Sequence, residues 1–160
     1  TRAEDEMAQY CVENGIGILC YGTVAGGFFS ERFLGVAEPT SFDTRSNVKY
    51  LLVIKEFGGW DLFQELLRVL DVIAKTHNTD IGTIASAYIV NRPGVAAVIV
   101  GARNLSHLES NLKIPTIKFS ETELAAIANV LSRSKGPKGP VYYLERYNDE
   151  HRNIMHTNNN

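Results

Sequence analysis

The chain has 160 residues, of which 44% are hydrophobic and 21% are charged, and its formal net charge is −2. Its length is that of one ordinary domain, and its apolar content is that of a globular chain. The near balance of charge gives no electrostatic basis for binding nucleic acid or a membrane surface, and no apolar run is long enough to span a bilayer. We therefore expect a cytoplasmic globular protein without nucleic-acid or membrane partners.

The N-terminus is charged with both signs and lacks the apolar segment of a signal peptide. It starts at Thr1 rather than at a methionine, which we interpret as the start of a fragment or of a processed chain. The two cysteines, Cys11 and Cys20, are too few for a disulfide framework. We expect both to be reduced, buried thiols.

Residues 3–13 are predicted to be the end of a helix, with Met7, Tyr10 and Cys11 on one side. Asn14-Gly15 stops that helix, because glycine accepts the left-handed conformation found after a helix end.

An apolar run over 16–21 follows directly and leads into a glycine-rich turn over 22–27. A run bounded in this way is typical of a strand buried on both faces. The succession of helix, glycine stop, buried strand and glycine-rich loop indicates an α/β protein.

The next segment, 28–60, is a long connection with many turn formers and little periodicity over 28–47. The apolar run over 50–54 fits either a strand or a helix, because periodicity does not distinguish them at this length. A connection this long in a compact domain is more often functional than idle.

Asp61 is predicted to cap the following helix, with Gln64 in the reciprocal position of the cap. One apolar stripe runs along that helix and comprises Leu62, Phe63, Leu66, Leu67, Leu70 and Ile73. A further helix begins near Asp80 and ends before Pro93.

Gly94 opens a second strand over 95–100, whose β-branched residues and lack of alternation predict burial on both faces. A loop over 101–104 and a short helix over 106–112 come next. Each predicted strand is thus followed by a loop rich in small residues and then by a helix.

Ser120 and Glu123 form a capping box for a helix that reaches about residue 132. From residue 135 the repeated Lys-Gly-Pro breaks regular structure, so we divide the chain into a barrel portion, 1–134, and a C-terminal tail, 135–160.

Two strand–loop–helix units are the local plan of a barrel in which the loops at one face carry the site. Two strands cannot close a barrel, and they leave ladder edges and an apolar face uncovered. The sequence therefore predicts a missing partner, which is more N-terminal chain, another copy or another protein.

Two segments carry a resemblance to a known family. Gly15–Ser30, which reads GIGILCYGTVAGGFFS, resembles the seventh strand and loop of aldo-keto reductases, and Val98–Leu112, VIVGARNLSHLESNL, resembles their eighth strand, loop and helix. The order and spacing of the two segments also match, and the resemblance covers almost the whole chain. It implies an α/β fold that is the C-terminal part of a (β/α)8 TIM barrel, incomplete in this chain.

The resemblance also implies an activity, which is hydride transfer from NADPH to an aldehyde or ketone once the N-terminal half is joined. The family's tyrosine, lysine, aspartate and histidine lie on early strands, so this chain has no catalytic residue to which they map. The tail holds residues of these types in the wrong part of the chain, namely Lys138, Tyr142, Tyr143, Asp149 and His151.

What the resemblance does place here is a nicotinamide cofactor site in two parts. Tyr21 matches the aromatic ring that stacks on the nicotinamide. The loop that approaches the pyrophosphate through exposed N–H groups is matched by Gly22, Val24, Gly26 and Gly27.

The second part holds the adenine and the 2′-phosphate in the family, and it is matched by Gly101, Ala102, Arg103, Asn104, His107, Ser110 and Asn111. Arg103 is expected to pair with phosphate oxygens, and Asn111 to bond the adenine edge. His107 stands where arginine or glutamine is frequent, and Ser110 where glutamate is usual. Because His107 is only partly charged near neutral pH, the pattern favours NADP without excluding NAD.

No other residue pattern in the sequence indicates a functional site. The four histidines lack zinc-ligand spacing, so we assign no metal site.

Three hypotheses for the function of the chain remain open: part of an NADP-dependent aldo-keto reductase, a truncated binding or scaffolding module without catalysis, and one half of a split enzyme.

Overall fold

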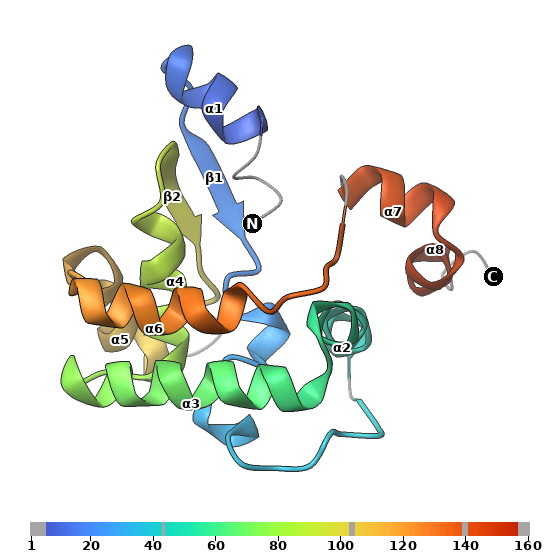
Figure 1. Ribbon diagram of the computed structural model, residues 1–160, viewed down its shortest axis with the longest axis horizontal. Coiled ribbons are helices and arrows are strands. Elements are labelled where there is room, and N and C mark those ends of the chain that lie inside the picture. The colour runs from blue at the N-terminus through green and yellow to red at the C-terminus, as the bar shows by residue number, and fades with distance from the viewer. Residues whose placement is uncertain (1–5, 43, 103–104, 139–140, 157–160) are drawn as a thin grey trace.

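The computed structural model describes residues 6–42, 44–102, 105–138 and 141–156, and it is mostly helical with one two-stranded sheet (Figure 1). The longer elements are α1 (Glu6–Glu13), β1 (Ile18–Tyr21), α2 (Arg45–Phe57), α3 (Trp60–Thr76), α4 (Ile81–Val90), β2 (Val95–Ile99), α5 (Leu108–Lys113), α6 (Glu121–Leu131), α7 (Val141–Tyr147) and α8 (Asp149–His156). Short 3-10 turns lie at η2 (Ala25–Gly27), η3 (Glu31–Phe33), η4 (Leu105–His107) and η5 (Ile114–Thr116).

The predicted helix stop before the first strand is confirmed. Gly15 has φ +65°, and the Ile16 N–H donates to the Cys11 carbonyl at 2.8 Å, so the backbone turns out of α1 through a left-handed residue. Cys11 and Cys20 are free cysteines, as expected, but only Cys11 is buried, because Cys20 lies on a strand that is covered on one face.

The two strands pair in parallel, with Cys20 opposite Val98 and Tyr21 opposite Ile99. The prediction that both faces of both strands are buried is wrong. Val98 packs against the core from one face, whereas Leu19, Tyr21 and Ile99 on the other face are 61%, 76% and 58% exposed. A continuous apolar sequence is typical of strands that are buried on both faces, whereas the described residues pack against only one face of these strands.

The core is centred on α3, which contacts both α4 and α6 (Figure 1). The predicted stripe of α3 is buried throughout: Leu62, Phe63, Leu66, Leu67, Leu70 and Ile73 are at most 8% exposed. Phe28 is fully buried and lies within 6.3 Å, ring centre to ring centre, of Phe33, Phe42, Trp60 and Phe63. This aromatic cluster fastens the chain after β1 to the start of α3.

The ambiguous run over 50–54 is helical, within α2. Thr44 caps this helix by accepting from the Asn47 N–H, and the pair Gly58 and Gly59, with φ +150° and +89°, separates it from α3. The long connection therefore contains a thirteen-residue helix that packs on α3.

The predicted cap of α3 at Asp61 is wrong. The glycine pair sets the start of α3 at Trp60, which leaves Asp61 inside the first turn, where its charge still suits the helix dipole. Gln64 is buried instead: its side chain accepts from the Gly35 N–H at 2.8 Å and donates to the Phe33 carbonyl at 2.7 Å. It thereby fixes the loop that crosses the start of α3.

The predicted start of a helix near Asp80 and the predicted capping box of Ser120 and Glu123 are confirmed. The Asp80 side chain accepts from the Thr83 N–H at 2.6 Å at the start of α4, and Ser120 and Glu123 form the capping box of α6. Burial raises the pKa of Glu123, but hydrogen bonds from Ser120 and His77 outweigh it, so the pKa lies below its ordinary value. His77 joins the end of α3 to α6 through this carboxylate at 2.9 Å.

The predicted break at the Lys-Gly-Pro repeat is confirmed for its described part, 135–138, which has no helix or strand. Beyond it, α7 and α8 form, and α8 packs on α2 (Figure 1). Lys49 of α2 pairs with Glu145 of α7, and His151 of α8, 4% exposed, contacts Glu56 of α2 at 2.9 Å. Among the described residues, no helix is both long and apolar enough to cross a membrane.

Candidate functional site

The parallel pairing brings both predicted loops to one edge of the sheet. Because Tyr21 lies opposite Ile99, the loop after β1 and the loop after β2 leave neighbouring strand ends in the same direction. This is the edge where parallel sheets with helical connections carry their sites. Tyr21, at the last position of β1, is 76% exposed, so its ring is available to a ligand.

The loop after β1 has a run of left-handed backbone. Gly22, Ala25, Gly26 and Gly27 have φ of +69°, +47°, +64° and +96°. Ala25 and Gly27 donate their N–H groups within the loop, to Gly22 and Val24 carbonyls, both at 2.9 Å. These two donors are occupied in this conformation, so an anion would be received by other N–H groups of the loop.

The side chain of Tyr50, on α2, lies against this loop. A Cβ built on Gly22 would collide with the Tyr50 hydroxyl, and one built on Gly26 would lie 2.9 Å from the Tyr50 ring. Burial raises the pKa of Tyr50 above its ordinary value, with Lys49 lowering it and the Tyr21 phenol raising it further. Sequence reasoning missed this residue because α2 was not recognised, although the Thr44 cap with a following helical run was a usable signal.

The second predicted part of the site follows β2. Gly101 and Ala102 are exposed, and the Asn111 side chain donates to the Gly101 carbonyl at 3.4 Å. Ser110 is half-buried and donates to the His107 carbonyl at 3.2 Å, while His107 is exposed. Arg103 and Asn104 lie outside the described residues.

Helix α4 holds both parts of the site. The Thr23 hydroxyl, in the first loop, is 2.8 Å from the hydroxyl of Ser86, and the Thr83 hydroxyl donates to the Ser110 carbonyl of α5 at 3.3 Å. Ser86 and Thr83 are 1% and 2% exposed and lie one helical turn apart. The spacing between the two parts is therefore set by one buried helix.

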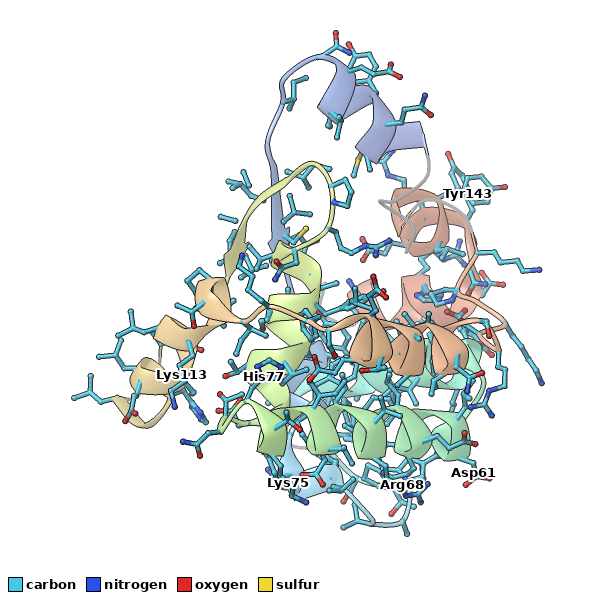
Figure 2. The ribbon with its side chains drawn as sticks, turned by 60° about the vertical axis from the view of Figure 1, so that its left-hand side comes forward. Asp61, Arg68, Lys75, His77, Lys113 and Tyr143 are labelled. Carbon is cyan, nitrogen blue, oxygen red and sulfur yellow. The ribbon has the colours of Figure 1, made fainter. Side chains whose placement is uncertain are left out.

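Lys113 of α5 donates to the carbonyl of Asn78, which follows the end of α3, at 3.0 Å. Figure 2 shows Lys113 and His77 on the same side of the molecule. Asp61, Arg68 and Lys75 follow the outer side of α3, away from the strand ends (Figure 2). The described residues contain no group of three histidines, cysteines or carboxylates arranged to hold a metal ion.

The tail residues that resemble catalytic types lie elsewhere. His151 is buried against Glu56, and Tyr143 is exposed on α7 with its ring 4.8 Å from that of Tyr147 (Figure 2). Neither belongs to the strand-end site.

The site suits a ligand that has a flat ring and phosphates. Tyr21 offers an exposed aromatic face, and a Cβ built on Gly27 or Gly101 would meet no atom within 4 Å, so both backbone segments are open to close approach. A nicotinamide dinucleotide has this chemistry, and the residues present fit it.

Comparison with known proteins agrees with this arrangement. The sequence model of the Aldo/keto reductase family matches residues 1–132. The chain is 25% identical over 126 residues to an aryl-alcohol dehydrogenase of Pestalotiopsis microspora and 26% identical over 125 residues to norsolorinic acid reductase B of Dothistroma septosporum, covering 78% of this chain and 29% of each relative. An aldo-keto reductase of Strobilurus tenacellus is 27% identical over 128 residues, which cover 78% of this chain and 36% of the relative.

The chain thus spans about a third of the length of the curated relatives it matches. The match extends over both strands, both loops and the helices that hold them, and it ends before the tail. On this evidence the chain belongs to the aldo/keto reductase family.

Proposed function

We propose that this chain is the C-terminal, cofactor-binding part of an aldo-keto reductase barrel, with residues 1–134 in the barrel and 135–160 as a tail. The whole protein would reduce an aldehyde or ketone with NADPH. The observation that carries the proposal is the pairing of two parallel strands whose loops leave one edge and are both tied to α4.

In this proposal the Tyr21 ring stacks on the nicotinamide and fixes which face is presented to the substrate. The backbone of Gly22, Val24, Gly26 and Gly27 approaches the pyrophosphate, and Gly27, where a Cβ would meet no atom within 4 Å, leaves room for that approach. The bound cofactor supplies the hydride, and the residues of this chain orient it.

The adenosine end of the cofactor is assigned to Gly101, Ala102, Arg103, Asn104, His107, Ser110 and Asn111. Arg103 pairs with phosphate oxygens, and the His107 ring donates a hydrogen bond to a 2′-phosphate. This arrangement favours NADP, whereas NAD would make less use of both side chains.

The uncovered strand face supports an N-terminal half as partner. Leu19 and Ile99 are exposed apolar side chains on one face of a parallel sheet, and parallel sheets are normally covered on both faces. The names of two relatives make an aromatic aldehyde and its alcohol the first substrate pair to assay with the joined protein.

The test is a titration of NADPH into this chain, followed by nicotinamide fluorescence and by melting temperature. We expect saturable binding with a raised melting temperature, weakened by Arg103→Ala and unchanged by Arg68→Ala, an exposed arginine on the outer side of α3 (Figure 2). A cooperative melt without binding would contradict the proposal and favour a module without a cofactor. Equal weakening by both variants would contradict the assignment of Arg103.

A further inference from the structure

Helix α2 presses on the glycine loop through one side chain. The Tyr50 hydroxyl occupies the space of a Gly22 Cβ, and its ring, together with the Ser46 hydroxyl, fills that of a Gly26 Cβ at 2.9 Å from each. Glycine is therefore favoured at both positions for two reasons: the backbone φ is positive, and Tyr50 occupies the space that a Cβ would need.

Tyr50 is also positioned next to Tyr21. It is half-buried and packs against the core, and its hydroxyl lies against Gly22, the residue that follows Tyr21. One face of the Tyr50 side chain thus contacts the loop, and its hydroxyl end lies by the last residue of β1.

Other contacts hold α2 in this place. The Asn47 side chain donates to the Gly26 carbonyl at 3.0 Å, which links the first turn of α2 to the same loop. The tail also contacts α2, through Lys49 with Glu145 and through Glu56 with His151. The tail, the helix and the loop form one continuous chain of contacts.

We propose that Tyr50 is a positioning residue for the cofactor site: by bracing the loop after β1 from α2, it selects the one backbone conformation in which the loop and Tyr21 receive the dinucleotide. A loop with several left-handed residues has many accessible conformations, and a rigid ring packed beneath it removes most of them before the ligand arrives. The ligand named here rests on the proposed function, whereas the bracing itself does not.

The first test needs no cofactor. Hydrogen exchange is measured on this chain for Ala25, Gly27 and Phe29, whose N–H groups bond loop carbonyls at 2.9, 2.9 and 3.2 Å. Tyr50→Ala is expected to speed their exchange by about tenfold or more while amides of α3 keep their rates. Tyr143→Ala, an exposed tyrosine on α7, should leave the loop unchanged. Loop rates that stay the same in Tyr50→Ala, or that rise together with those of α3, would overturn the bracing role.

The second test is a rescue. Gly22→Ala places a methyl group against the Tyr50 hydroxyl, so we expect NADPH affinity to fall at least about fivefold. Adding Tyr50→Phe removes the colliding atom and leaves the ring carbon Cζ at 3.2 Å, so the double variant should regain about threefold or more of the loss, with the strain of φ +69° remaining. Should Tyr50→Ala not fold, Tyr50→Leu, which removes the ring but keeps an apolar side chain, takes its place in the exchange experiment.

A double variant that binds no better than Gly22→Ala would overturn the proposal. If the unmodified chain does not bind NADPH at all, the proposed function fails, and the exchange experiment alone decides whether Tyr50 braces the loop.

Discussion

Replacing Ser86 by alanine should loosen the first loop and destabilise the fold by about 1–2 kcal/mol. The Ser86 hydroxyl is 1% exposed and 2.8 Å from that of Thr23, and an intramolecular hydrogen bond of this kind contributes about 0.5–1.5 kcal/mol net. A buried partner left without a bond costs about 1–3 kcal/mol, and Thr23 is only half-buried, so water offsets part of that cost.

The assay is urea unfolding of Ser86→Ala, Thr23→Val and the double variant, with Ser41→Ala in an exposed loop as control. The two single changes should be coupled by about 1 kcal/mol, because removing both hydroxyls leaves no unpaired group. The melting temperature of Ser86→Ala should fall by about 2–8 °C. A loss below about 0.5 kcal/mol, or additive single changes, would refute the reasoning that this bond ties the loop to α4.

Three further changes test the packing, a cap and a titration. Phe28→Ala should cost about 3–5 kcal/mol in urea unfolding, because its ring is fully buried among other rings, and a loss under about 2 kcal/mol would contradict that packing. Ser120→Ala should lower stability by about 1 kcal/mol by removing the cap of α6, and an unchanged thermal melt would argue against the cap. Burial raises the pKa of Tyr50 in the folded chain, so the folded state is stabilised relative to the unfolded state while the phenol is protonated. This stabilisation is fully present below the unfolded pKa of 10.0 and is lost as pH rises toward the higher folded pKa. Stability measured from about pH 9 to about pH 11 should therefore fall less steeply in Tyr50→Phe, and parallel curves would contradict the shift.

Local signals predicted the parts of the fold that depend on near neighbours. The capping residues Asp80 and Ser120 and the stripe of α3 were readable because a cap or a helical face is determined within a few residues. Asp61 failed for a related reason: the preceding glycines, Gly58 and Gly59, set the start of α3 two residues earlier than its polar residues suggested.

Features that depend on packing between segments distant in the sequence could not be predicted from the sequence. Burial of a face of β1 depends on which segments pack against it. The apolar run therefore indicated that both faces favour burial, but it could not show that the described residues bury only one of them. The docking of the tail depends on Lys49 and Glu56 of α2, which are ninety or more residues from Glu145 and His151. Tyr50 could be placed beneath the glycine loop only once α2 was known to be a helix that faces it.

The candidate site divides in the same way. Tyr21, Gly22 and Gly101 were predicted as site residues from two motifs, and the strand pairing places the two segments at one edge of the sheet. The hydroxyls of Thr83 and Ser86, which hold the two segments together, gave no signal because small polar residues inside an apolar helix look like ordinary helix residues.

The pairing of Ile18 with Val95 also determines how this chain must fold. Helices α2, α3 and α4 lie between the two strands in the sequence, so the sheet closes through contacts of long sequence separation, which we expect to make folding slow. During that interval β1 is an apolar strand with free backbone groups, which is the kind of segment that pairs with other chains. Slow synthesis at low temperature, or production together with a segment that covers the open face, should therefore raise the yield of soluble chain.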